Sequence, residues 1–158
     1  MVNEGIEIIG IAEVNINWSK IIIKENIYSS KDIWFKERSI ITGYNKSTLS
    51  DGPFQSGDTA IMAVGKVSCR TIKTGKEFSK LGCWSWMLLR GKKNIRTIII
   101  TVYCPIVSAS TGGAYSQQLE TLAIMIIHND LSSKFWIDLN KDTSKWIHQG
   151  EQIILMWD

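Results

Sequence analysis

Apolar residues in this chain of 158 residues occur in short runs rich in isoleucine and valine, separated by Gly, Asn, Ser and Pro. Such runs predict strands buried in a sheet, because β-branched side chains favour extended backbone. We expect strands at 6–14, 39–44, 59–67, 83–89, 95–103 and 152–157. The turn signal Arg90-Gly91-Lys92-Lys93-Asn94 joins the fourth and fifth of these strands into a hairpin.

Helical spacing of apolar residues marks two segments between the fifth and sixth strands. These residues are Leu119, Leu122, Ala123 and Ile126 in the first segment, and Phe135, Leu139, Trp146 and Ile147 in the second. The spacing predicts helices over 114–128 and 131–148. Residues 19–38 suit a strand or a helix, and we favour a helix; 45–57 is predicted to be a loop and Arg70 to Leu81 a basic turn region. The order of elements predicts one mixed α/β (α+β) domain over 1–158 rather than strict βαβ alternation.

Composition supports a folded intracellular domain. An apolar fraction of 44%, a charged fraction of 21% and only 2 Pro argue against disorder. Three cysteines without CxxC spacing disfavour a disulfide framework or a zinc site, and indicate a reducing compartment. Glu4 and Glu7 stand where a signal peptide carries positive charge, so the sequence does not indicate secretion. The longest apolar run, 98–109, is shorter than the roughly 18–20 residues that span a bilayer, so we expect no membrane association.

Two acidic residues stand at the ends of apolar runs. Glu13 ends the run that begins at Ile8, and Asp158 follows the last strand. Carboxylates at strand ends are suited to a hard cation such as Mg²⁺, although the same position also marks where a strand meets solvent. Tyr103 ends the fifth strand. Its hydroxyl either contacts a phosphate, or is exposed to solvent while the ring packs at the edge of the core. Asn15 and Asn17, which follow Glu13, are candidate contacts for a nucleic acid.

Nine basic residues lie between Lys66 and Arg96, opposed by a single acidic residue. Arg90, Lys92 and Lys93 in the hairpin turn are the candidates to contact a phosphate backbone; the alternative is a solvated hairpin rim. The two histidines are expected to be helix-end residues rather than general bases. No common hydrolase or nucleotide-binding signature is present.

Four segments together resemble the endonuclease/exonuclease/phosphatase superfamily, and within it the endonuclease-like domains of retroelements that carry a reverse transcriptase. IIGIAEVNINW resembles the strand that ends in the family's metal-binding Glu, at Glu13. GDTAIMAV resembles its "GG-x-A-I" strand, with Asp58 at the second Gly. LGCWSWMLLRGKKNIRTIIITVYCP resembles its "LGRW" hairpin and "Y-x-P" strand, with Tyr103 as the phosphate-side Tyr. FWIDLNKDTSKWIHQGEQIILMWD resembles the helix and strand leading to "GD-x-N", with Asp158 as that Asp.

The resemblance implies a four-layer α/β/β/α sandwich that hydrolyses phosphate esters with Mg²⁺, with Glu13 as a metal ligand and Asp158 orienting or activating the attacking water. Trp157 and Cys83 stand where the family has Gly and Arg. The family's first Asn-bearing strand would precede Met1, and its Asn and Ser-Asp-His motifs would follow Asp158. We therefore expect a partial domain, inactive by itself, with one sheet face uncovered and prone to self-association.

Three functions follow from these observations. The first is a fragment of a Mg²⁺-dependent phosphodiesterase, retroelement-derived and acting on DNA rather than RNA. The second is a non-catalytic nucleic-acid-binding module that uses the basic hairpin, and its mark would be binding that weakens steeply with salt. The third is a phosphomonoesterase of the same superfamily.

Overall fold

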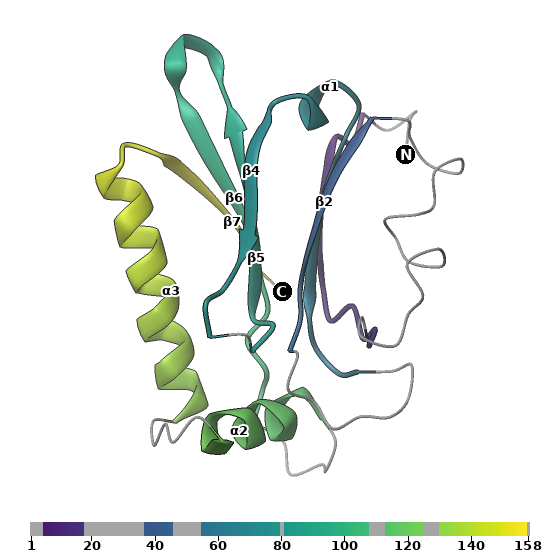
Figure 1. Cartoon of the computed structure of the whole chain (residues 1–158), viewed down its shortest axis with the longest axis vertical. Helices are drawn as coiled ribbons and strands as arrows, with labels where there is room; N and C mark the ends of the chain where they lie inside the picture. Colours follow the sequence, from purple (N-terminus) through teal and green to yellow (C-terminus); the bar gives the residue numbers. More distant parts are fainter. Residues whose placement is uncertain are drawn as a thin grey trace.

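The computed structural model describes residues 5–17, 37–45, 55–79, 81–107, 113–124 and 130–157. They form a mixed α+β structure with a three-stranded and a four-stranded sheet that face each other (Figure 1). Helix α3 (Leu131–His148) covers the outer face of the four-stranded sheet, and α2 (Ala114–Ile124) lies across one end of the sandwich. None of the described helices is long and apolar enough to cross a membrane.

The four-stranded sheet has the order β4-β5-β6-β7. Its strands are β4 (Thr71–Lys76), β5 (Trp84–Arg90), β6 (Arg96–Val102) and β7 (Gln152–Trp157). β5 and β6 form the predicted hairpin, closed by the 3₁₀ turn η3 (Lys92–Asn94). The chain then passes through α2 and α3 and returns as β7, which pairs parallel to β6. This return explains why two helices separate the last two strands in the sequence.

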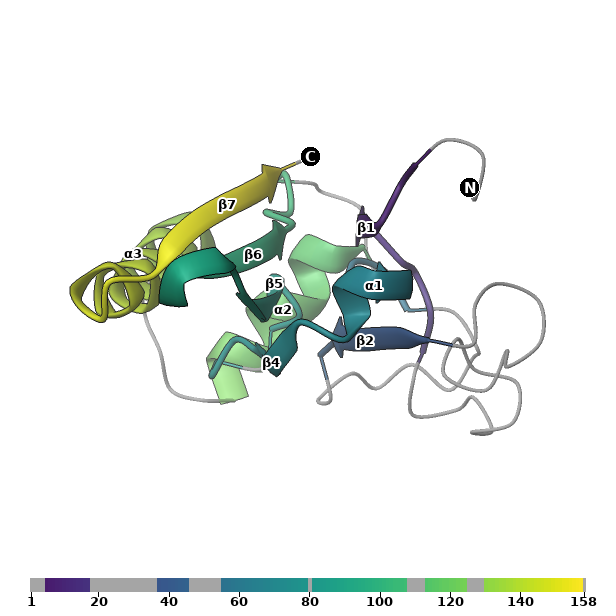
Figure 2. The same ribbon diagram turned by 90° about the horizontal axis from the view of Figure 1, so that it is seen from above.

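The three-stranded sheet has the order β1-β3-β2, with all pairs antiparallel. Its strands are β1 (Ile8–Ala12), β2 (Arg38–Gly43) and β3 (Thr59–Val64). The central β3 is buried at all six residues. A one-turn helix, α1 (Gly65–Ser68), connects β3 to β4, and Figure 2 shows the two sheets from this end of the molecule.

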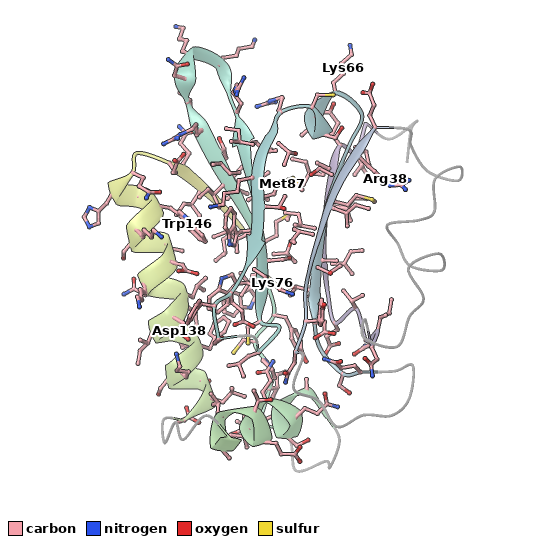
Figure 3. The ribbon with its side chains drawn as sticks, viewed as in Figure 1. Arg38, Lys66, Lys76, Met87, Asp138 and Trp146 are labelled. Carbon is pink, nitrogen blue, oxygen red and sulfur yellow. The ribbon has the colours of Figure 1, made fainter. Side chains whose placement is uncertain are left out.

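Alternating side chains of β5 and β6 supply two separate cores. One set packs between the sheets, where Met87 lies with Ile61 and Ile99. The other set packs under α3, where Trp84 meets the ring of Phe135 edge to face at 5.8 Å. Both sets are mainly apolar because this sheet is covered on both faces, although Ser85 and Thr101 are also buried. Figure 3 shows Met87 between the sheets and Trp146 between α3 and the four-stranded sheet.

Glycine at position 10 lets the sheets approach closely where β1 crosses β6 and β7. A Cβ atom added to Gly10 would lie 2.3 Å from Thr101 Oγ1 and 2.6 Å from Met156 Cε. No side chain fits in that space without displacement of a neighbour. The close approach brings the end of β1 next to the ends of β6 and β7.

The long periodic elements follow the sequence prediction. The helix predicted at 131–148 and the strand at 152–157 are found at those bounds. The strands predicted at 39–44 and 83–89 are each displaced by one residue, and the strand predicted at 95–103 is shortened by one residue at each end. The helix predicted at 114–128 is described as far as Ile124. Of the helix favoured for 19–38, residues 19–36 lie outside the described residues, and Arg38 belongs to β2.

Two predictions are wrong. The basic turn predicted for Arg70 to Leu81 contains β4, an edge strand that pairs with β5 through a bulge between Thr71 and Lys73. The lysines and Gly75 gave this segment no strand pattern. An edge strand needs no continuous apolar pattern, because its hydrogen bonds to the neighbouring strand hold it in the sheet. The strand predicted at 59–67 is found and begins at the predicted residue, but its end was wrong: it stops at Val64, and residues 65–67 belong to α1.

Candidate functional site

Glu13 and Tyr103 meet at one end of the sandwich. Tyr103 Oη donates a hydrogen bond of 2.6 Å to Glu13 Oε1, across 90 positions of sequence. Each residue directly follows a strand, β1 for Glu13 and β6 for Tyr103. Glu13 is exposed, so its carboxylate reaches solvent, while Tyr103 is half-buried. The pairing of an exposed carboxylate with a fixed phenol makes this end the candidate site.

The phenol is held in its protonated, donating form. Burial, and then the hydrogen bond to Glu13, raise the pKa of Tyr103 above its ordinary value. Glu13 itself has a φ of 49°, in the left-handed region that non-glycine residues seldom adopt. Such backbone strain persists only where surrounding contacts hold it, and it occurs often at functional sites.

Asn15 holds the turn that precedes β3 against this site. Its Oδ1 accepts a hydrogen bond from Gly57 N–H at 2.9 Å, and its own N–H donates to Gly57 C=O at 3.0 Å. Gly57 has a φ of 91°, and a Cβ there would lie 3.4 Å from the ring of Tyr103. The side chain of Asn15 therefore positions backbone beneath Tyr103. Asn17, the other predicted contact, is buried.

Asp58, the next residue, is buried in a polar network that sequence reasoning missed. Its Oδ1 accepts hydrogen bonds of 3.3 Å from Asn45 N–H and from Gln55 Nε2, whereas its Oδ2 has no partner among the described residues. Burial raises the pKa of Asp58 to about 8. The network continues to α2 through a hydrogen bond of 2.8 Å from Asn45 Nδ2 to Thr121 Oγ1. An acidic residue directly before an unbroken apolar strand was the only signal in the sequence.

Asp158 lies outside the described residues. The strand that leads to it is described: β7 ends at Trp157, opposite Val102 in the parallel register with β6. Val102 immediately precedes Tyr103, so the end of β7 lies alongside the strand end that carries the candidate site. His128 is also outside the described residues, and His148 is an exposed residue at the end of α3.

The basic hairpin lies at the other end of the sandwich. Arg90, Lys92 and Lys93 are exposed at the tip joining β5 to β6, whereas Tyr103 follows the far end of β6. The seven residues of β6 separate these two points by about 20 Å. Figure 3 shows Lys66, on α1, near the same basic end.

Backbone contacts fix two of the basic residues beside each other. Arg90 N–H donates to Arg70 C=O at 2.8 Å, and Arg70 Nε donates to Arg90 C=O at 2.7 Å. Other cations of the cluster interact elsewhere: Lys76 Nζ lies 3.9 Å from the ring centroid of Tyr44, and Arg96 pairs with buried Glu151 at 2.5 Å. The exposed positive charge is thus concentrated around the hairpin tip and Arg70.

The fit of a Mg²⁺ ion depends on Glu13. In the described ranges, no group of three or more His, Cys, Asp or Glu residues is placed to hold a metal ion. Mg²⁺ nonetheless binds commonly through one or two carboxylates, with water and substrate phosphates as the remaining ligands. The exposed carboxylate of Glu13 fits this kind of site, in which phosphate and metal bind together.

The chain was compared with protein-family models, with curated proteins and with solved structures, and no match was found in any of the three.

Proposed function

We propose that this chain is part of a Mg²⁺-dependent phosphodiesterase domain of the endonuclease/exonuclease/phosphatase type, similar to retroelement endonucleases and directed at DNA. One observation carries the proposal. Glu13 and Tyr103 were each singled out by a different sequence motif, and a hydrogen bond of 2.6 Å joins them at the end of the sandwich. Two facing sheets with a helix outside one of them are compatible with part of a four-layer α/β/β/α sandwich.

Each residue has a distinct role in the proposal. Glu13 would supply a carboxylate oxygen to the ion, and a bound Mg²⁺ would stabilise negative charge on the phosphoryl oxygens. Tyr103 keeps its proton because burial raises its pKa. Its hydroxyl donates that single proton to Glu13 in this structure, and it would turn to a phosphate oxygen when Glu13 binds the ion. Asn15 acts indirectly, by fixing the Gly57 backbone beneath the tyrosine ring.

A single carboxylate leaves most ligand positions of the ion to water and phosphate. We therefore expect weak binding of Mg²⁺ that strengthens when a phosphodiester is present. The proposal for residues 1–158 is binding of metal and phosphodiester at this site, with little or no hydrolysis.

Paramagnetic Mn²⁺ in place of Mg²⁺ tests this proposal. With Mn²⁺ and bis(p-nitrophenyl) phosphate present, amide NMR signals around Glu13, Gly57 and Tyr103 should broaden first. Glu13→Gln should abolish this selective broadening. Glu7→Gln is the matched control, because Glu7 is an exposed carboxylate that precedes the opposite end of β1.

Equal broadening in wild type and Glu13→Gln would contradict the metal site. Release of p-nitrophenolate by wild type, abolished by Glu13→Gln, would instead show that residues 1–158 hydrolyse the diester by themselves.

The concentration of exposed charge at the hairpin tip favours a second candidate, non-catalytic binding of a nucleic-acid backbone. Replacing Lys92 and Lys93 together by Ala should weaken DNA binding. It should also make the slope of the logarithm of the association constant against the logarithm of salt concentration shallower by about two. The matched control replaces Lys141 and Lys145, both exposed on α3. Binding that is insensitive to salt, or unchanged in the hairpin variant, would exclude this candidate.

A further inference from the structure

β7 is an edge strand with an open backbone. Among the described residues it pairs with β6 alone, so the N–H and C=O groups on its other side have no strand partner there. Its six residues contain no charge, no Pro and no Gly, and its register with β6 is unbroken. A strand of this kind is a template for pairing with another strand.

The opposite edge of the same sheet is protected. β4 carries Lys73 and Lys76 and has a bulge after Thr71. Edge lysines and bulges are devices by which proteins prevent edge-to-edge pairing. Of the two edges of this sheet, only β7 lacks such devices.

Apolar side chains flank the open edge on both faces of the sheet. On the α3 side, Leu155 is 45% exposed and Trp157 46%, and the Trp157 ring stacks on Trp136 at 5.2 Å between centroids and 16° between planes. On the other side Ile154 is 51% exposed. Figure 2 shows β7 along the side of the molecule, with no other strand beyond it. An added strand would cover apolar side chains as well as backbone.

We propose that β7 pairs with β7 of a second copy of this chain, as antiparallel neighbours about a two-fold axis perpendicular to the sheet. Opposed residues in an antiparallel pair point to the same face, so a two-fold axis at Leu155 places Leu155 opposite its own counterpart. It also places Ile153 opposite Trp157 of the second copy, both on the α3 side. An uncharged strand brings no like charges together in this arrangement. A two-fold axis uses the β7 edge of both copies, and the other edge of this sheet, β4, is protected, so the pairing through this sheet closes at the dimer.

Sedimentation velocity of the whole chain across a range of concentrations tests the proposal. Wild type should show a monomer–dimer equilibrium. Leu155→Lys places two ammonium groups opposite each other at the axis and should raise the dimer dissociation constant at least about tenfold. Ile154→Lys, on the other face, should act in the same direction. Ile72→Lys is the matched control, since Ile72 is 44% exposed on the protected edge strand β4.

A charge-swap experiment tests the register. Leu155→Lys and Leu155→Glu should each dimerise poorly, but a mixture of the two should form a heterodimer at least about tenfold tighter than either alone, since only this register opposes the two positions. Circular dichroism and thermal melting of each monomer confirm that the variants fold.

The proposal is overturned if wild type stays monomeric at all concentrations, or forms species larger than a dimer. It is equally overturned if Ile72→Lys disrupts the dimer as strongly as Leu155→Lys, or if the charge-swapped mixture fails to associate.

Discussion

Replacing Asp58 by Asn should change how the stability of this protein depends on pH. The Asp58 carboxyl is buried, and burial raises its pKa from 3.8 to about 8. Asparagine has nearly the same shape and keeps an oxygen that accepts from Asn45 and Gln55. Its amide nitrogen replaces Oδ2, which has no partner among the described residues. The substitution therefore removes a titrating group while it preserves the hydrogen bonds.

The magnitude follows from proton linkage. Between the ordinary pKa of an unfolded aspartate, 3.8, and the native value of about 8, the native state holds one more proton than the unfolded state. The protonated carboxyl of the native state therefore contributes its full share of the free energy of unfolding below the unfolded pKa. This contribution is lost as the pH rises towards the native pKa. One proton changes the free energy of unfolding by about 1.4 kcal/mol per pH unit, so from about pH 5 to about pH 7 wild type should lose about 3 kcal/mol relative to Asp58→Asn.

Urea denaturation at a series of pH values, followed by tryptophan fluorescence, measures this difference through the midpoint and slope of each transition. Glu120→Gln, an exposed carboxylate on α2, controls for the loss of one negative charge. Buried Glu77, whose pKa burial raises to about 7, remains in both proteins, so its own titration is present in both stability curves. Parallel stability curves for wild type and Asp58→Asn from about pH 5 to about pH 7 would refute the argument.

Three further substitutions test other parts of the structure. Gly10→Val should destabilise the sandwich by about 1–3 kcal/mol in urea denaturation, because its Cβ would overlap Thr101; an unchanged midpoint would mean that the sheets are farther apart. Tyr103→Phe should lower thermal stability by only about 0.5–1.5 kcal/mol, the usual cost of one hydrogen bond, so a larger loss would point to a structural role for that hydroxyl. Asp130→Ala should cost about 1 kcal/mol and increase amide exchange in the first turn of α3, since Asp130 accepts from Ser133 N–H as the N-cap; unchanged exchange would contradict that role.

The sequence predicted elements best where a single pattern ran for many residues. Helix α3 has apolar residues at helical spacing and a glycine two residues past its end, and its bounds were predicted correctly. β4 was missed because its lysines and glycine belong to an edge strand, whose partner β5 decides its conformation. A local sequence pattern identifies an element when its own apolar residues are buried in the core. It fails when hydrogen bonds to a neighbouring strand decide the conformation.

Some features of the candidate site were likewise set by the local sequence, and others by the tertiary structure. Sequence alone determined that Glu13 and Tyr103 follow apolar strands, because the change from apolar to polar residues fixes where a strand leaves the core. Their contact across 90 residues was decided by the tertiary structure, through the close approach of β1 to β6 at Gly10. The buried state of Asp58 was likewise decided there, since the residues that enclose it come from segments far apart in the chain. Burial and long-range contact are properties of packing, which a strand's own residues do not encode.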